Sequence, residues 1–141
     1  MGNRAVITTK AGWANQAGNL GVYLHWNGGR DSVEAFLTYC KMQGYRAPES
    51  DNYGWARMCQ VIGNFFGGDL SVGLDVVSRL DCDNWDNGVY IIENWKIVDR
   101  KCFKGVEQQN YDLIEMLLEI DKAMPAGLQL GADKINDLIT K

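Results

Sequence analysis

The sequence predicts an α+β fold, a small antiparallel sheet of about five strands with two helices packed on one face and a C-terminal helix. Short β-prone runs bounded by turn residues occur in both halves of the chain, and three longer segments place apolar residues at helical spacing. The chain is long enough to bury one hydrophobic core. We therefore expect a single α+β domain over residues 1–125, followed by a tail at 126–141 that adds a short helix.

The N-terminal half begins with two strands, expected at 4–9 and 20–26. The loop between them is too short for a crossover connection, which favours antiparallel pairing. Helices are expected at 31–42 and 53–66, because apolar residues recur there every three or four positions. The apolar stripe of the second helix consists of Trp55, Met58, Cys59, Ile62, Phe65 and Phe66. We interpret this aromatic stripe as core packing rather than as a ligand surface.

A three-stranded meander is expected next, with strands within 70–80, at 89–93 and at 95–103. The triplet at 86–88, Asp-Asn-Gly, predicts a hairpin between the first two of these strands, because Asn-Gly readily adopts the left-handed angles of a type I′ turn. Asn94 predicts a second tight turn between the last two strands.

The third helix is expected at 108–124 and ends before Pro125. Its apolar face, together with that of the tail, exceeds what one small sheet can cover. We therefore expect a homo-oligomer, a dimer or a larger closed assembly.

The formal net charge of −4 argues against binding to DNA or RNA duplexes, which requires clustered Lys and Arg. No apolar run approaches membrane-spanning length, and the N-terminus lacks the pattern of a signal peptide, so we expect a cytoplasmic protein with no membrane partner. The cysteines are scattered without a CxxC pair and are expected to be free thiols. They are Cys40, Cys59, Cys82 and Cys102.

Few residues in the chain are suited to catalysis. His25 is the only histidine, and its position within an apolar strand favours a structural, hydrogen-bonded role over a triad or a metal site. The acidic run that starts at Asp81 fails as a calcium loop, because Asp86 stands where the loop needs glycine. We therefore expect a protein that is not an enzyme and that has no cofactor and no metal.

The most informative stretch is the turn at Asn27-Gly28-Gly29, which follows a strand and opens a helix. Unpaired N–H groups and the helix dipole favour an anion at such a place, and Arg30 adds a cation that suits phosphate. Asp31 is expected to be the N-cap, with Glu34 completing a capping box. The same turn is equally compatible with an ordinary connection between a strand and a helix.

Two resemblances to known families include this stretch. The run WNGGRDS at 26–32 resembles the SGGxDS loop of the N-type ATP pyrophosphatases, which holds the pyrophosphate of ATP, but Asn27 stands in place of Ser. That family has a parallel sheet, whereas the segment after the first helix here, 45–52, is polar and interrupted by Pro48. An ATP pyrophosphatase-like enzyme is therefore an alternative function.

The second resemblance covers more of the chain. The strings YLHWNGGRDSVEAFL, YGWARMCQVIGNFFGG and DNGVYIIENWKIV resemble short proteins of Firmicutes phages and prophages, and within that group the chain is similar to the Thoeris anti-defence sponges. The resemblance implies a viral immune-evasion protein in the infected bacterial host cell, which sequesters cyclic ADP-ribose isomers such as gcADPR without cleaving them. It also implies a helical oligomer interface and, in some members, binding of cyclic oligonucleotides.

The residue types available support tight nucleotide binding, for which aromatic faces, N–H donors and arginines are needed. One expected wall of the site consists of Trp26, Asn27, Gly28, Gly29, Arg30 and Asp31, and the opposite wall of Arg57, Asn64 and Phe65. The two arginines are expected to pair with phosphate, while Trp26 or Phe65 stacks on adenine. A further alternative is a protein-binding inhibitor of a defence nuclease, of the anti-CRISPR type, because an acidic protein suits a basic nuclease surface.

Overall fold

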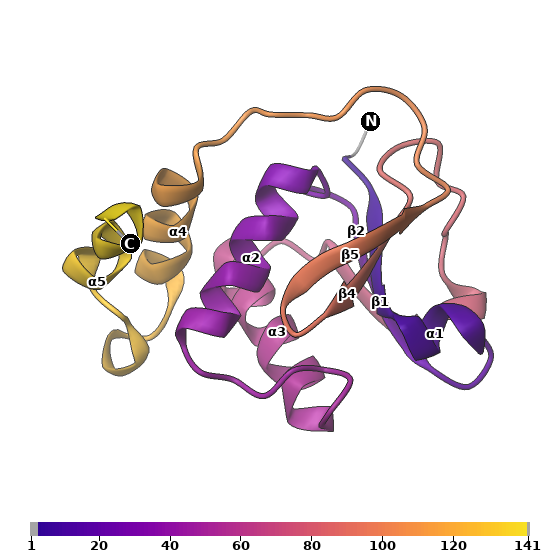
Figure 1. The fold of residues 1–141 in the computed structure, drawn as a ribbon, viewed down its shortest axis with the longest axis horizontal. Coiled ribbons are helices and arrows are strands. Elements are labelled where there is room, and N and C mark those ends of the chain that lie inside the picture. Colours follow the sequence, from indigo (N-terminus) through magenta and orange to yellow (C-terminus); the bar gives the residue numbers. More distant parts are fainter. Residues whose placement is uncertain (1–2, 141) are drawn as a thin grey trace.

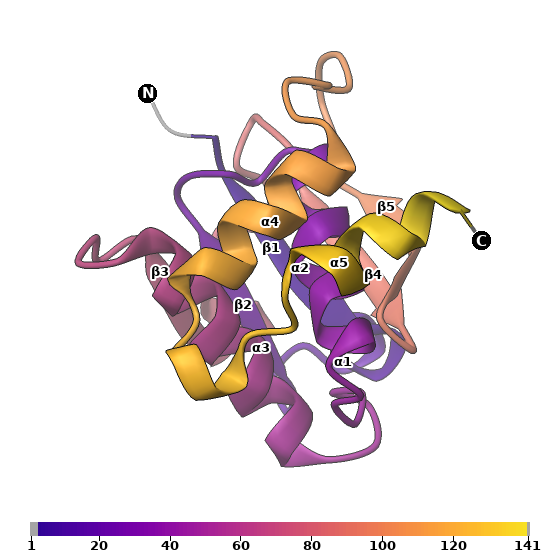
Figure 2. The ribbon, with the colours of Figure 1, turned by 90° about the vertical axis from the view of Figure 1, so that its left-hand side faces the viewer.

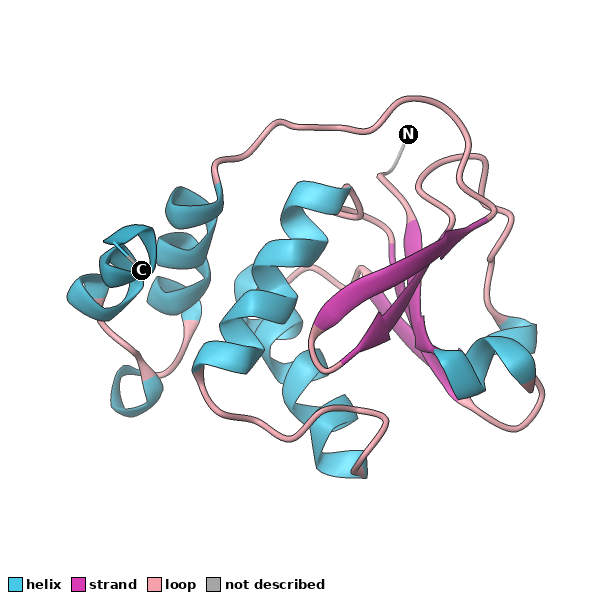
Figure 3. Ribbon diagram, viewed as in Figure 1, coloured by secondary structure: helices cyan, strands magenta, loops and turns pink. Residues whose placement is uncertain are grey.

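The computed structural model describes residues 3–140, with side chains up to residue 138, and contains one five-stranded sheet (Figures 1 and 3). The strands are β1 (Ala5–Thr9), β2 (Leu20–Leu24), β3 (Val72–Val76), β4 (Val89–Glu93) and β5 (Lys96–Lys101). Their order across the sheet is β3-β2-β1-β4-β5. The predicted α+β class with about five strands is confirmed.

The helices are α1 (Lys10–Ala14), α2 (Arg30–Met42), α3 (Asn52–Phe66), α4 (Leu113–Ala123) and α5 (Ala132–Asn136), with 3₁₀ turns η1 (Val77–Arg79), η2 (Ala126–Leu128) and η3 (Asp137–Thr140). One face of the sheet is covered by α2 and α3, and α4 with α5 forms a further layer outside them (Figures 1 and 2). None of the described helices is long and apolar enough to cross a membrane. The short helix expected in the tail is present as α5.

The sheet is mixed, because β1 runs parallel to β4 while the other three neighbouring pairs are antiparallel. The predicted pairing of the first two strands is confirmed, but the meander is wrong, since β3 pairs with β2 and not with β4. The hairpin predicted from Asn-Gly does not form. Asn87 is instead buried, and its side-chain amide donates to the carbonyl oxygen of Arg4 at 3.0 Å. This segment anchors the start of β1 instead of closing a hairpin.

The turn predicted at Asn94 is confirmed as the link between β4 and β5. Asn94 and Trp95 both have left-handed backbone angles, with φ of 49° and 62°, as a type I′ turn requires. A bulky residue is rare at such an angle. Here the Trp95 side chain is buried, and its Nε1 donates to the carbonyl oxygen of Tyr45 at 2.9 Å, which offsets the backbone strain.

Helix prediction was wrong at two places. The segment expected as a loop after β1 contains α1, which Thr9 caps by accepting the N–H of Gly12. The third helix starts only at Leu113, because residues 104–112 run as an extended strap from β5 to α4 (Figure 1). Asp112 caps α4 by accepting the N–H of Glu115 at 3.1 Å.

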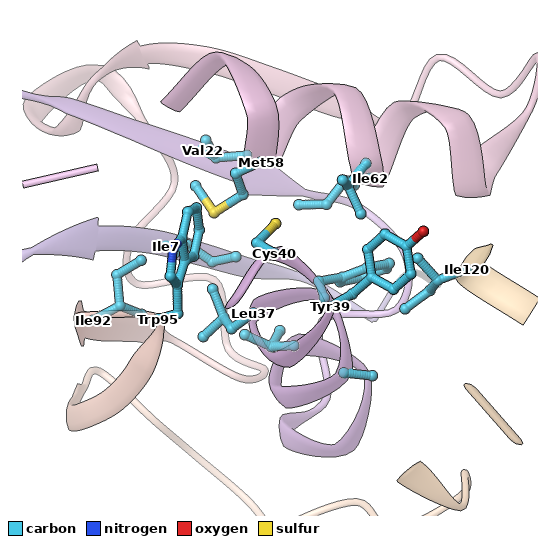
Figure 4. Packing of buried hydrophobic residues seen from close by; sticks show 14 of the residues in the cluster. Ile7, Val22, Leu37, Tyr39, Cys40, Met58, Ile62, Ile92, Trp95 and Ile120 are labelled. Atoms are coloured by element: carbon cyan, nitrogen blue, oxygen red, sulfur yellow. The ribbon is translucent and has the colours of Figure 1, made fainter. Parts of the chain in front are cut away.

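The hydrophobic core lies between the sheet and the helices, and Figure 4 shows its centre around Ile7, Cys40 and Met58. The aromatic stripe of α3 packs on this core, as predicted, with Phe65 and Phe66 edge-to-face against Phe36. Most apolar residues of α4 and α5 are also buried or half-buried within the chain. They include Met116, Leu117, Ile120 and Ile135. These buried helix faces therefore give no support to an oligomer interface formed by α4 and the tail.

Candidate functional site

The N-terminus of α2 does not have the predicted cap. Gly29 is the N-cap, with extended backbone angles and no side-chain hydrogen bond, and Arg30 is the first helical residue. The capping box is wrong because the Arg30 Nε donates to the Glu34 Oε1 at 2.8 Å, which occupies both side chains on the helix surface. Asp31 lies inside the first turn and accepts the N–H of Ser32.

The first glycine of the pair before α2, Gly28, is packed against the start of β1. A Cβ on Gly28 would lie 2.4 Å from the carbonyl oxygen of Asn3 and 2.9 Å from the Cβ of Ala5. The Gly28 carbonyl oxygen accepts the hydroxyl of Tyr90 at 2.7 Å. Glycine is therefore needed at position 28 for close packing against β1. Asn27 has φ of 55°, and its Nδ2 donates to the Oγ of Ser32 at 3.2 Å.

Asp31 occupies the place where an anion was expected. The side chain is buried, and its Oδ2 accepts the N–H groups of Asn110 and Tyr111 at 2.6 and 2.9 Å. A negative charge is favourable near a helix N-terminus. The protein itself supplies that charge, and the carboxylate holds the 104–112 strap. This end of α2 is a structural junction, and Trp26 lies beside it, half exposed, with its ring edge-on to His25.

The three residues of the second predicted wall lie in different surroundings. Asn64 donates to the Met124 sulfur at 3.5 Å, whereas Phe65 packs in the core and borders a hollow beneath α4. Arg57 lies beside the loop that follows the C-terminal end of α2. Because α2 rises 1.5 Å per residue, its two ends are about 18 Å apart. Arg30 and Arg57 are therefore not brought together.

The histidine and the cysteines make structural contacts or are shielded from solvent. The predicted hydrogen-bonded role of His25 is confirmed, since its Nδ1 lies 3.0 Å from the hydroxyl oxygen of Tyr23. All four cysteines are free, and burial raises the pKa of the Cys40, Cys59 and Cys82 thiols. Within the part of the chain that the structure describes, no group of three or more His, Cys, Asp or Glu side chains is arranged to hold a metal ion.

The C-terminal end of α2 opens into a groove that we call the Tyr53 groove, lined by Gly44, Tyr45, Arg46, Tyr53 and Arg57. After α2 the chain reverses at Gly44, where φ is 79°, an angle that glycine adopts without strain. The indole of Trp95 then fixes the loop through the Tyr45 carbonyl oxygen. Asp51 caps α3 by accepting the N–H of Tyr53 at 2.7 Å.

Two guanidinium groups flank one exposed aromatic ring in this groove. The Cζ atoms of Arg46 and Arg57 each lie 5.5 Å from the centroid of the Tyr53 ring. Arg46 also pairs with Asp51 at 3.1 Å, whereas Arg57 donates to the neutral Gln60 at 3.0 Å. The hollow between these side chains has a volume of about 220 Å³. The arrangement provides cationic donors and aromatic faces side by side.

Only Arg57 of the Tyr53 groove was expected from the sequence. Tyr53 and Arg57 are four residues apart on one helix and therefore share a face, a local signal that was available. The contribution of Tyr45 and Arg46 depends on how the loop folds back on α3, which spacing does not reveal.

Desolvation on burial raises the pKa of the Tyr45 hydroxyl, and the positive charge of Arg57 opposes this shift. The hydroxyl is therefore protonated at neutral pH and can donate or accept a hydrogen bond. The groove can bind an anionic planar ligand through charge, hydrogen bonds and stacking. Comparison with protein-family models, with curated proteins and with solved structures finds no match to this chain.

Proposed function

We propose that the protein binds a phosphorylated nucleotide in the Tyr53 groove and sequesters it without cleavage, as a phage anti-defence sponge for a cyclic nucleotide immune signal. The observation that carries this proposal is the pair of guanidinium groups, from Arg46 and Arg57, whose Cζ atoms each lie 5.5 Å from the centroid of the exposed Tyr53 ring. Guanidinium groups recognise phosphate with paired N–H donors, and an exposed ring accepts a stacked base.

The charges around the groove favour an incoming phosphate. Arg57 makes its hydrogen bond to a neutral amide, so no carboxylate competes for it there. The pair between Arg46 and Asp51 is largely solvent-exposed on the arginine side, and an exposed ion pair costs little to rearrange.

The volume of the groove limits how much of a ligand it encloses. Pockets that enclose a drug-sized molecule have volumes of roughly 300 to 1,000 Å³. The Tyr53 groove, at about 220 Å³, lies below this range and would enclose only part of a nucleotide. A cyclic ADP-ribose isomer or a cyclic dinucleotide would bind with one phosphate and one base in the groove and the remainder outside it.

The chemistry of the groove favours binding over turnover. Tyr45 lies next to Arg57 in the groove. Because the pKa of its hydroxyl is raised, Tyr45 is protonated at neutral pH. The thiol behind it, Cys40, is buried, and burial raises its pKa as well. A group that is not ionised at neutral pH is a poor nucleophile. These surroundings support sequestration of an intact ligand.

The proposal is tested by calorimetric titration with cyclic ADP-ribose isomers and with cyclic di- and trinucleotides, each ligand being recovered afterwards by heat denaturation. We expect saturable binding and a ligand that is returned intact. A chemically altered ligand would identify an enzyme, and no heat with any ligand would contradict the proposal and favour a protein partner.

A pair of arginine variants locates the site. We expect Arg57→Ala to weaken binding by about 10- to 100-fold, the loss of one charge-assisted contact. Arg30→Ala removes a cation of the same type from the opposite end of α2 and serves as the matched control. Unchanged affinity in Arg57→Ala combined with a loss in Arg30→Ala would move the site to the glycine turn.

A further inference from the structure

The two edges of the sheet differ in how they are protected. The β5 edge carries Lys96, Asp99 and Lys101, and the last two form an ion pair at 3.3 Å. Charges of this kind discourage pairing with another strand. On β3, the even-numbered residues are Val72, Leu74 and Val76, all apolar. The Leu74 side chain is 55% exposed, and Leu70 just before the strand is fully exposed.

The free backbone groups of β3 belong to these apolar residues. The N–H of His25 donates to the Ser71 carbonyl oxygen and that of Val77 to the Asn19 carbonyl oxygen, so odd-numbered residues of this segment form the ladder with β2. Even-numbered residues therefore direct their N–H and C=O groups away from the sheet. The N–H of Val76 is already held by the Oδ1 of Asp75 at 2.8 Å.

From this edge we infer that a second copy of the chain pairs with β3, antiparallel and centred on Leu74, to form a two-fold dimer with a continuous sheet. In this register Leu74 exchanges both hydrogen bonds with Leu74 of the partner subunit. The N–H of Val72 donates to the carbonyl oxygen of the partner's Val76, so the N–H of Val76 keeps its bond to Asp75. The interface is isologous, as two-fold symmetry requires.

Charge and local conformation disfavour the registers centred on Val72 and on Val76, and the charge swap described below distinguishes the Leu74-centred register from one centred on Gly73. Centring on Val72 would place Asp75 directly opposite the partner's Asp69, a destabilising pair of like charges. Centring on Val76 would require a strand through residues 77–79, where the chain forms η1. Centring on Leu74 places Asp75 opposite the partner's Gly73, so no like charges face each other.

Gly73 supports the same arrangement. A Cβ built on it would meet nothing closer than the Tyr23 Cβ at 3.6 Å, and its backbone is extended like the rest of β3, so nothing within the chain requires glycine there. In the dimer the missing side chain leaves room for the partner's Asp75. A hollow of about 240 Å³, lined in part by Tyr23 and Gly73, lies at this position on the side of the sheet away from α3.

The dimer is tested by sedimentation velocity of the full chain from micromolar to hundreds of micromolar concentration. We expect a monomer–dimer equilibrium that Leu74→Lys shifts toward monomer by at least about tenfold. Val98→Lys introduces the same charge at an exposed position of the opposite edge strand and should leave the equilibrium unchanged. A monomeric wild type, or a dimer that survives Leu74→Lys, would overturn the inference.

A charge swap tests the register itself. Gly73→Glu places a carboxylate opposite the partner's Asp75 and should dissociate the dimer, while the space around Gly73 lets the monomer fold. Combining Gly73→Glu with Asp75→Lys makes the facing charges opposite and should restore the dimer. Circular dichroism confirms that each variant is folded. A double variant that stays monomeric while folded would contradict the Leu74-centred register.

Discussion

The two ends of α2 both lie next to a glycine turn, yet one is filled by the chain itself and the other is open to solvent. At the N-terminal end, Gly28 is packed against β1, and Asp31 occupies the anion position and binds the 104–112 strap. At the C-terminal end, a Cβ on Gly44 would meet nothing within 4 Å, and the turn opens into the Tyr53 groove. A glycine turn beside a helix end is therefore open to a ligand only where tertiary contacts do not fill it.

The largest effect is expected from Asp31→Ala. Removing the carboxylate leaves the N–H groups of Ser32, Asn110 and Tyr111 without their acceptor. We expect a loss of about 2 to 4 kcal/mol in the free energy of unfolding, measured by urea denaturation. Ligand affinity at the Tyr53 groove should not change.

The matched substitution near the C-terminal end of α2 is Asp51→Ala, which removes the cap of α3. One exposed capping bond contributes about 1 kcal/mol, so the loss should be clearly smaller. Equal losses in the two variants would contradict the view that Asp31 is the more important structural carboxylate.

Gly28 and Gly44, the glycines at the two ends of α2, should also differ in why alanine is unfavourable. Gly28→Ala forces a methyl group against the Asn3 carbonyl oxygen and should destabilise the protein by about 1 to 3 kcal/mol. Gly44→Ala meets no neighbour but must adopt a positive φ, which costs about 1 to 2 kcal/mol. Thermal unfolding measures both losses, and a Gly28→Ala variant more stable than wild type would contradict the packing role.

The elements of the fold follow local patterns and were largely predicted, whereas the errors in strand pairing and in the start of α4 concern contacts between residues far apart in the chain. Helices α2 and α3 and the β4–β5 turn were predicted from spacing and from Asn94. The parallel pairing of β1 with β4 was not, because the Asn87 side chain binds the backbone of a residue at the other end of the sequence, Arg4. Residues 108–112 of the strap were likewise expected to be helical, because the hydrogen bonds from the strap to Asp31 cannot be recognised from local spacing.

The candidate site was predicted only in part, for the same reason. A glycine turn and an arginine can be recognised in any sequence, but whether the turn is occupied depends on tertiary contacts. Arg57 was expected in a site, but its partners were not, because the 45–51 loop brings Tyr45 and Arg46 to α3 only in the folded chain. The Tyr53–Arg57 spacing was the one local clue.

Arg46→Ala tests the open, C-terminal end of α2. Arg46 is exposed and forms an ion pair with Asp51. Its loss should therefore weaken ligand binding by only about three- to tenfold, which is less than the effect expected for the loss of Arg57. Calorimetry measures the affinity, and the unfolding free energy should stay within about 0.5 kcal/mol of wild type. A larger effect than that of Arg57→Ala would mean that the Asp51 pair orients Arg46 for the ligand.

An equally small effect on stability, and the most specific test of the groove, is expected from substitutions of Tyr53. Its ring is 55% exposed, so Tyr53→Leu should change the free energy of unfolding by no more than about 0.5 kcal/mol. If a base stacks on this ring, the same change should weaken nucleotide binding by about 5- to 100-fold, while Tyr53→Phe retains the aromatic face and most of the affinity. Equal affinity in Tyr53→Leu and Tyr53→Phe would show that the ring does not stack on the ligand. The open end of α2 would then bind phosphate through its arginines alone.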